Sequence, residues 1–214
     1  MEQPVRSHRE YDRPELSLDE LGDDPLVAYR RWLAEAEAAD LPEPGAITVA
    51  TVDADGRPDA RIVLLREIDE RGIIFYTNRR SMKGRQLAAV PAAAVVSYWD
   101  PLHRQVRMRG AVHVLDDAAS DAYFAGRPRP SQLAAWASEQ SEPIVDRAEL
   151  EQRVAELDRR FADAEVPRPP YWGGYRVEAQ EVEFWQGRPA RLHERLRYRW
   201  SGDRHGWQVD RLQP

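Results

Sequence analysis

Alternating apolar and polar positions divide the middle of the chain into β-strands. Residues 46–52 and 60–65 are rich in β-branched side chains, and the turn sequence Asp-Ala-Asp-Gly at 53–56 separates them. A second turn at 69–72 leads into an apolar segment at 73–77. Short turns between consecutive strands favour antiparallel pairing, so these three segments predict an antiparallel meander.

Two longer segments continue the β pattern. The first covers residues 93–99, and the second covers 105–115 and alternates between two faces. Its apolar face carries Val106, Met108, Val112 and Val114, and its polar face carries Gln105, Arg107, Arg109 and His113. This pattern is typical of a strand that is buried on one side only. Shorter strands are expected at 175–177, 181–185, 196–200 and 207–212.

Helix signals flank the strand-rich region. Asp24 is an N-cap candidate directly before Pro25, so a helix is expected to begin there. Ser81 can cap a second, short helix. Residues 116–165 have a helical pattern, and the clearest helix in that range covers 147–161.

These elements predict one domain preceded by an arm. Residues 1–23 are polar and are expected to form a mobile N-terminal arm, whereas residues 24–214 are expected to form a single domain. Strands outnumber helices and show no regular βαβ alternation, which argues against a Rossmann-type sheet. The economical fold class is mainly β with peripheral helices (α+β), built on an antiparallel barrel.

Composition argues against several classes of protein. The 214 residues are 42% hydrophobic and 32% charged, which suits a packed domain. The longest apolar run, residues 87–96, is too short to span a membrane, and the N-terminus lacks the apolar segment of a secretory signal. The chain has no cysteine, so a cytoplasmic location is expected. A net charge of −6 disfavours a general nucleic-acid binder.

The sequence also lacks the motifs of several kinds of catalytic site. Neither of the common phosphate-loop motifs occurs, and the nucleophile elbow of hydrolases is absent. The five histidines show no metal-ligand spacing, so no metal site is expected. The scattered carboxylates suit a solvated surface better than a glycosidase pair. One basic residue is distinctive, because Lys83 is the only lysine among 31 lysines and arginines.

A first cluster of cations brackets an apolar strand. Arg61 and Arg66 stand at the two ends of the sequence RIVLLR. They differ by five positions, so an unbulged strand places them on opposite faces. Either a bulge intervenes or the two arginines serve different partners, and two surface arginines are an equally good interpretation.

A second cluster lies where a strand ends and a helix begins. Tyr76 and Thr77 close the strand, and Lys83 follows in the first turn of the helix capped by Ser81. A helix N-terminus attracts phosphate, and a cation is disfavoured there unless an anion binds nearby. The sequence therefore suggests a phosphate site, with a flexible surface lysine as the alternative.

Two further clusters combine cations with aromatic side chains. Arg127 and Ser131 flank a proline-stiffened turn, although Ser131 could instead cap the next helix. Trp185 could stack on a planar ring or fill the core. The segment 191–195 could be an exposed charged loop, or a site that needs an anion if it is buried. Together the four clusters suggest a protein that binds planar, phosphorylated molecules.

The chain resembles the FMN-dependent pyridoxine/pyridoxamine 5′-phosphate oxidases over nearly its whole length. The most specific motifs, in order, are RIVLL, FYTN, SxKG, RQV, YFxxRPRxSQ, WASxQS, PxWGGYRV, EFWQGRxxRLHxR and the C-terminal RLxP. The resemblance implies a split β-barrel and a homodimer with FMN at the subunit interface. It implies a single enzymatic role, the formation of pyridoxal 5′-phosphate.

The resemblance also implies residue roles. FMN contacts are expected at Arg61, Ile62, Val63, Leu64, Leu65, Arg66, Tyr76, Thr77, Met82, Lys83, Gln105, Gln140, Ser141, Trp185 and Arg195. Substrate contacts are expected at His8, Arg9, Glu10, Tyr11, Arg66, Tyr123, Arg127, Ser131, Arg191, Leu192 and His193. Arg191 and His193 are the expected catalytic residues, lining the face where the substrate C4′ sits.

The implied reaction is hydride transfer from C4′ of the substrate to the flavin. With the amine substrate, the imine product is hydrolysed to the aldehyde, and oxygen reoxidises the flavin to give hydrogen peroxide. The cofactor supplies the redox chemistry and the protein orients it.

The sequence departs from the family pattern at four positions. Arg66 stands where lysine is usual, Met82 and His8 stand where arginine is common, and Ala134 replaces a glycine. Arginine keeps the charge of lysine but not its geometry. Two alternatives are therefore kept: a flavin oxidase of the phenazine-biosynthesis type, and a non-catalytic flavin or pyridoxal-phosphate binding protein.

Overall fold

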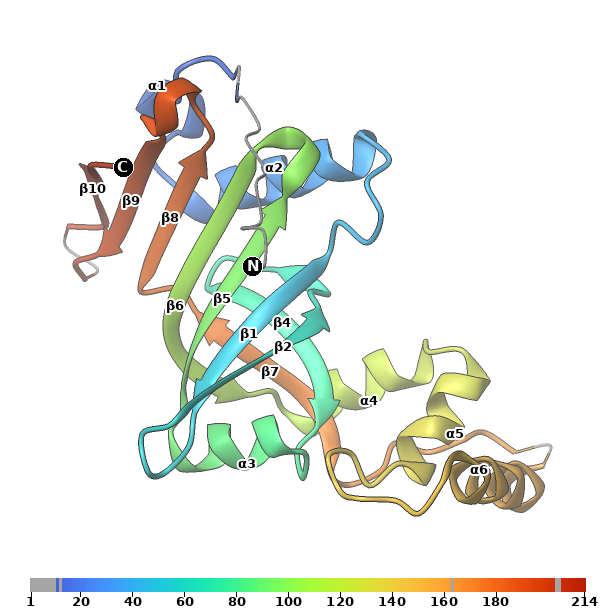
Figure 1. Cartoon of the computed structure of the whole chain (residues 1–214). Coiled ribbons are helices and arrows are strands. Elements are labelled where there is room, and N and C mark those ends of the chain that lie inside the picture. The colour runs from blue at the N-terminus through green and yellow to red at the C-terminus, as the bar shows by residue number, and fades with distance from the viewer. Residues whose placement is uncertain (1–10, 12, 163, 203–204) are drawn as a thin grey trace, which may run out of the picture.

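The computed structural model describes residues 11, 13–162, 164–202 and 205–214. Ten strands in this part of the chain form a strongly curved sheet (Figure 1). The strands are β1 (Ala46–Val52), β2 (Pro58–Leu64), β3 (Glu67–Ile68), β4 (Gly72–Asn78), β5 (Ala92–Trp99), β6 (Arg104–Val114), β7 (Trp172–Glu178), β8 (Glu181–Gln186), β9 (Glu194–Trp200) and β10 (Trp207–Arg211). The helices are α1 (Leu18–Leu21), α2 (Pro25–Ala38), α3 (Met82–Ala89), α4 (Asp117–Ala125), α5 (Arg129–Ala137) and α6 (Arg147–Phe161), with 3₁₀ turns at Asp100–Leu102 and Pro189–Arg191.

Strand β6 connects the two halves of the barrel. Its first part, Arg104–Arg109, pairs with β8, and its last part, Val112–Val114, pairs with β7. Gly110 lies at the change of partner, where a Cβ atom would approach the carbonyl oxygen of Glu178 to 1.8 Å. Only glycine permits this close approach, so the strand can bend there and leave the barrel split.

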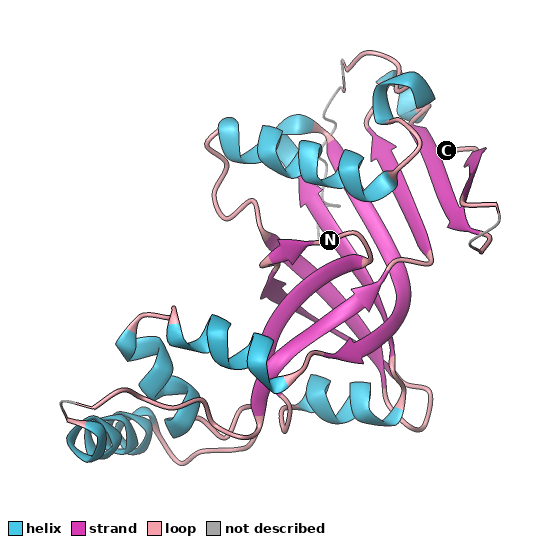
Figure 2. Ribbon diagram, turned by 180° about the vertical axis from the view of Figure 1, so that it is seen from behind, coloured by secondary structure: helices cyan, strands magenta, loops and turns pink. Residues whose placement is uncertain are grey.

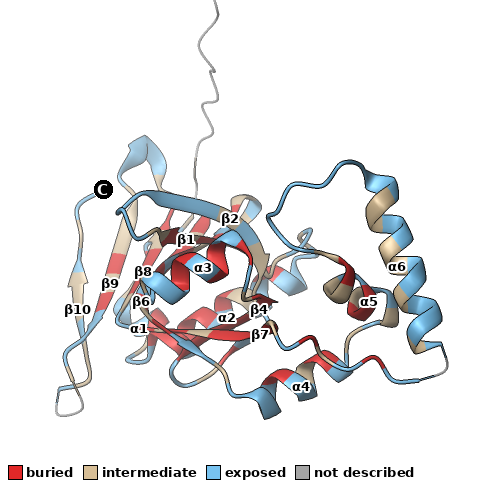
Figure 3. Ribbon diagram, turned by 90° about the horizontal axis from the view of Figure 1, so that it is seen from below, coloured by how far each residue is buried: buried red, intermediate tan, exposed pale blue. Residues whose placement is uncertain are grey.

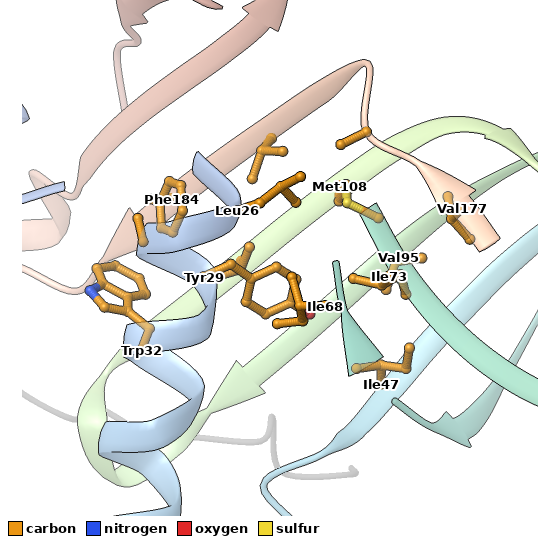
Figure 4. Packing of buried hydrophobic residues seen from close by; sticks show 14 of the residues in the cluster. Leu26, Tyr29, Trp32, Ile47, Ile68, Ile73, Val95, Met108, Val177 and Phe184 are labelled. Atoms are coloured by element: carbon orange, nitrogen blue, oxygen red, sulfur yellow. The ribbon is translucent and has the colours of Figure 1, made fainter. Parts of the chain in front are cut away.

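Helix α2 covers the open side of the curved sheet (Figure 2). The carboxylate of Asp24 accepts hydrogen bonds from the backbone N–H groups of Leu26 and Val27, which fixes the start of the helix. Figure 4 shows Tyr29 and Trp32 of α2 in the core, with Trp32 beside Phe184. Burying such a side chain contributes on the order of 2–3 kcal/mol.

A second, smaller apolar cluster holds helices α4 to α6 beside the barrel. It is centred on Phe124, Leu133, Val166 and Trp172. Helix α6 has no fully buried residue and is largely exposed in Figure 3. It therefore forms the outer wall of the region that contains α5.

The structure confirms a mainly β fold with peripheral helices, and it corrects four details. The predicted three-stranded meander is wrong. The N–H of Leu65 still donates to the carbonyl oxygen of Gly45, just before β1, but the N–H of Arg66 donates to the carbonyl oxygen of Ile74 in β4. The chain therefore changes its pairing partner between these two residues, and β4 pairs with β3 and β7. Val114 is 56% exposed, because it lies at the end of the barrel.

The other two corrections concern segment ends. Part of the predicted arm is packed, since Leu16 and Leu21 are buried and α1 forms there. Ser131 lies inside α5 and does not cap it, because the helix already begins after Pro128. Among the described residues, no helix combines the length and the apolar character needed to cross a membrane.

Candidate functional site

A buried lysine at the start of α3 is the centre of the first group of polar residues. The ammonium of Lys83 donates hydrogen bonds to Thr77 Oγ1 at 3.3 Å, Ser81 Oγ at 3.3 Å and Gln140 Oε1 at 2.9 Å. Lys83 is only 7% exposed. All three partners are neutral, and no ion pair of Lys83 with a carboxylate occurs in the described part of the chain. A buried ammonium without a counterion is costly, and an anion would remove this cost.

The pKa of Lys83 reflects this environment. Burial lowers it from 10.5 to about 8, and the nearby positive charge of Arg61 acts in the same direction. The carboxylate of Asp59 acts in the opposite direction but does not compensate. The site is therefore electropositive and favours a bound anion.

The beginning of α3 adds backbone donors to this group. Ser81 caps the helix, and its Oγ accepts from the N–H of Gly84 at 3.3 Å. The N–H of Met82 donates to Ser141 Oγ at 3.1 Å. Gln140 and Ser141 belong to the loop between α5 and α6 and contact the start of α3. Residues far apart in sequence therefore meet at one helix N-terminus, which is a favourable place for phosphate.

Arg61 of β2 lies beside this group. Its guanidinium donates to Thr51 Oγ1 at 2.6 Å and to Gln86 Oε1 at 2.9 Å. Arg66 follows the end of β2 and is exposed, and the backbone changes its pairing partner between Leu65 and Arg66. Which anion each of the two arginines serves stays a prediction.

A second group is a stack of aromatic rings. Tyr76 and Tyr123 are parallel with ring centroids 3.8 Å apart, and Trp172 continues the stack at 5.6 Å from Tyr76. The guanidinium of Arg127 lies 4.6 Å from the centre of the Trp172 ring. Such a cation–π contact fixes Arg127 without using its hydrogen-bond donors.

Arg127 lines a cavity, and its buried Nη1 has no hydrogen-bond partner among the described residues. Burial lowers the pKa of Arg127, and the positive charge of Arg66 acts in the same direction. A cavity of about 410 Å³ connects this region to the first group, since its lining includes Arg127, Ser131, Thr77 and Gln140.

A third group surrounds the ring of Tyr11. The centroids of His103, His193 and Trp185 lie 4.7, 5.4 and 5.9 Å from it. Trp185 is half-buried, so it is available for contact and is not a core residue. Burial lowers the pKa of His193, and the positive charge of Arg191 lowers it further, so both favour the neutral imidazole.

Charged residues on β8 and β9 extend the third group. Arg195 forms a two-point ion pair with the buried Glu183, at 2.8 and 3.1 Å. Gln105 lies opposite Trp185 in the β6–β8 register. Arg191 is exposed and has a φ of 62°, an uncommon conformation for a non-glycine residue.

Within one chain the third group is separated from the first two. Gln105 lies near the start of β6, with Trp185 opposite it in β8 (Figure 1). Tyr76 pairs with Gly174 of β7, whose carbonyl oxygen accepts from the N–H of Leu115, directly after the other end of β6. At about 3.3 Å per residue, the length of β6 places them roughly 20–30 Å apart. The predicted site residues thus form two half-sites.

Some predicted residues are not placed by the structure, and some polar contacts were not predicted. His8, Arg9 and Glu10 lie outside the described residues, and Ile62 and Leu192 are exposed. The sequence interpretation missed Thr51 and Gln86, which hold Arg61, and did not assign a role to Trp172. For Gln86, the one sequence signal of a role at this site was its position one turn after Lys83 on α3.

Comparisons with known proteins identify the family of the chain. The family "Pyridoxamine 5'-phosphate oxidase" matches residues 33–161, and the "Pyridoxine 5'-phosphate oxidase C-terminal dimerisation region" matches residues 172–214. The pyridoxine/pyridoxamine 5′-phosphate oxidase of Rubrobacter xylanophilus is 53% identical over 96% of this chain and 94% of its own. That of Thermosynechococcus vestitus is 52% identical over 96% of both chains.

Two solved structures share the fold of the chain. PhzG from Burkholderia lata 383, in complex with tetrahydrophenazine-1-carboxylic acid, superposes with a TM-score of 0.88 at 36% identity, covering 96% of this chain and 100% of its own. A pyridoxamine 5′-phosphate oxidase-related, FMN binding protein from Nostoc punctiforme shares the fold, with a TM-score of 0.70 at 21% identity over 87% of this chain and 97% of its own. The chain belongs to the pyridoxine/pyridoxamine 5′-phosphate oxidase family.

Proposed function

We propose that the protein is an FMN-dependent oxidase that converts pyridoxine or pyridoxamine 5′-phosphate to pyridoxal 5′-phosphate. Oxygen is the electron acceptor and hydrogen peroxide is the second product. The observation that carries the proposal is a pair of separate cationic sites near one cavity: Arg127 lines the cavity, and Lys83 bonds to Thr77 and Gln140, which also line it. Two phosphorylated molecules, a cofactor and a substrate, need two such sites.

The first cationic site fits the phosphate of FMN. Lys83 is buried among neutral oxygens, and Arg61 and the N-terminus of α3 lie beside it. These groups would hold a phosphate dianion by charge-assisted hydrogen bonds. Met82 contributes no positive charge, but the ion pair of Arg85 with Glu142 lies next to its sulfur.

The second cationic site fits the phosphate of the substrate. Arg127 lines the cavity and has a buried Nη1 without a partner among the described residues, and Ser131 lies on the same lining. Arg66 lies near enough to add its positive charge to that of Arg127. Arginine in place of the usual lysine at position 66 keeps this charge, so the departure is compatible with substrate binding.

His193 and Arg191 would line the face at which the substrate reacts. Nδ1 of His193 accepts a hydrogen bond from the N–H of Arg188 at 3.1 Å, so the neutral ring carries its proton on Nε2. That Nε2–H can donate to the oxygen or nitrogen on C4′ and orient it. FMN, when bound, supplies a two-electron acceptor that oxygen reoxidises.

The separation of the two half-sites supports a homodimer as the active form. The third group, with Trp185, Arg195 and His193, is too far from Lys83 and Arg127 to act with them in one chain. A match to a dimerisation region over residues 172–214, which include Trp185, His193 and Arg195 of this third group, supports the same assembly. We therefore place FMN at the interface, with one half-site from each chain.

An aerobic assay tests the proposed function. The FMN-reconstituted protein is given pyridoxine 5′-phosphate or pyridoxamine 5′-phosphate, and aldehyde and peroxide are followed together. Equal amounts of both products are expected. An FMN-loaded protein that yields neither product from either substrate would contradict the proposal.

A second candidate is a flavin oxidase of the phenazine-biosynthesis type. The similarity to PhzG, at a TM-score of 0.88, favours it, although the relatives at 52–53% identity bear the other name. Turnover of a dihydrophenazine-type compound without turnover of pyridoxine 5′-phosphate would support this candidate. FMN binding without turnover of either would support a binding role.

A further inference from the structure

The guanidinium of Arg61 is surrounded by acceptors on one side. Nη1 donates to the carbonyl oxygen of Val49 at 3.1 Å and to Thr51 Oγ1 at 2.6 Å. Nη2 donates to Gln86 Oε1 at 2.9 Å and to Asp59 Oδ2 at 2.6 Å. Four acceptors from β1, β2 and α3 therefore fix the position of one surface-strand arginine, although a long side chain is ordinarily free to move.

The two neutral side chains in this set also bind each other. Thr51 Oγ1 donates to Gln86 Oε1 at 2.6 Å, and both residues are buried, at 1% and 6% exposure. Gln86 Nε2 donates to Asp59 at 3.3 Å, which fixes the orientation of the amide. The pair thus presents oxygen atoms to Arg61 in one arrangement only.

This arrangement holds two positive charges close together. Arg61 is near enough to Lys83 for its charge to disfavour the charged lysine, and the exposed carboxylate of Asp59 offsets only part of this repulsion. Without a scaffold, the guanidinium of Arg61 would move away into solvent. Three of the four acceptors, at Val49, Thr51 and Gln86, are neutral, so they restrain Arg61 without cancelling its charge, whereas the exposed Asp59 offsets part of it.

We propose that Gln86 and Thr51 are positioning residues, which hold Arg61 beside Lys83 so that the two cations form a preorganised site for the cofactor phosphate. The inference rests on the proposed function, because it takes this site to be that of FMN. It assigns roles to two buried residues at which the family resemblance implies no contact with flavin or substrate. Their effect should therefore be confined to ligands that carry the phosphate.

The test compares FMN with riboflavin, which lacks the phosphate. Dissociation constants are measured by quenching of flavin fluorescence for the wild type, Gln86→Leu and Thr51→Val. Each substitution removes the oxygen that Arg61 uses and keeps a side chain of similar size. We expect FMN binding to weaken roughly 10-fold in both variants, while riboflavin binding stays unchanged.

Two control variants separate positioning from general stability. Ser97→Ala removes a buried hydrogen bond to Tyr29, 2.6 Å long, and should leave the affinities for both flavins unchanged. Asp59→Asn removes the ionic partner of Arg61 but not the neutral pair, so FMN affinity should stay the same or rise. A loss in Asp59→Asn as large as that in Thr51→Val would contradict the role of the neutral pair.

A second readout does not depend on flavin binding. Inorganic phosphate should raise the melting temperature of the FMN-free wild type and should do so less in Gln86→Leu and Thr51→Val. Equal loss of FMN and riboflavin affinity, or unchanged FMN affinity in both variants, would overturn the inference. A wild type that binds no FMN would instead overturn the proposed function.

Discussion

Replacing Lys83 with methionine should stabilise the FMN-free protein while weakening cofactor binding. The displacement of its pKa from 10.5 to about 8 corresponds to about 3 kcal/mol, at about 1.4 kcal/mol for each pH unit. Methionine has a similar length and no charge to desolvate. The side chains that Lys83 contacts keep other partners, since Thr77 bonds to Gln140 and Ser81 bonds to Asn78. A net gain of about 1–3 kcal/mol is therefore expected at pH 7.

The stability difference between Lys83→Met and the wild type should depend on pH. Below pH 8 the lysine is protonated in both the folded and the unfolded protein, so the folded state bears the full cost of the buried charge. Between pH 8 and 10.5 the folded protein releases the proton first, and the cost disappears. The advantage of Lys83→Met should therefore be largest near pH 7 and should vanish toward pH 10.5.

Urea unfolding of the FMN-free proteins at fixed protein concentration measures this difference. The same samples, titrated with FMN, should show at least roughly 10-fold weaker binding for the variant, since one charge-assisted contact to phosphate is lost. A variant that is less stable than the wild type at pH 7 would refute the argument. It would mean that the ammonium is satisfied by its neutral partners.

Three other outcomes are expected. FMN affinity of the wild type should fall as the pH rises above about 8, because Lys83 loses its proton, whereas riboflavin affinity should not; fluorescence titration checks this. Arg127→Leu should raise the KM for pyridoxine 5′-phosphate at least roughly 10-fold with a smaller change in kcat. Steady-state kinetics measure both constants, and an unchanged KM would contradict the assigned contact. Arg191→Glu should abolish turnover and leave the assembly intact by size-exclusion chromatography, and a wild-type rate would remove Arg191 from the site.

Helix starts were predictable because their signals are local. The carboxylate of Asp24 and the hydroxyl of Ser81 each accept from N–H groups two or three residues later, so capping needs no knowledge of the rest of the fold. The alternating faces of residues 105–112 were predictable for the same reason. Each depends only on neighbours in sequence.

Strand pairing was harder, because it depends on distant segments. β4 pairs on one side with the short β3, which takes the place expected for residues 60–65, and on the other side with β7, about 100 residues later. The sequence of the short turn at 69–72 does not indicate that the backbone changes its pairing partner between Leu65 and Arg66. The bend at Gly110 is likewise visible only once Glu178 lies against it.

The candidate site was predictable to the extent that its residues carry charge in an unusual place. Lys83 was identified because a cation is disfavoured at a helix start, and the structure places it among neutral partners there. Gln86 and Thr51 were missed, because a buried amide and a buried hydroxyl have no distinctive sequence pattern. Their role emerges only from the geometry around Arg61.

The most direct test of the central claim is a single turnover without oxygen. FMN-loaded protein is mixed anaerobically with pyridoxine 5′-phosphate, and the flavin absorbance is followed while the aldehyde is quantified. The account predicts that the flavin is bleached and that one aldehyde forms for each flavin reduced. An unchanged flavin spectrum with no aldehyde would contradict it.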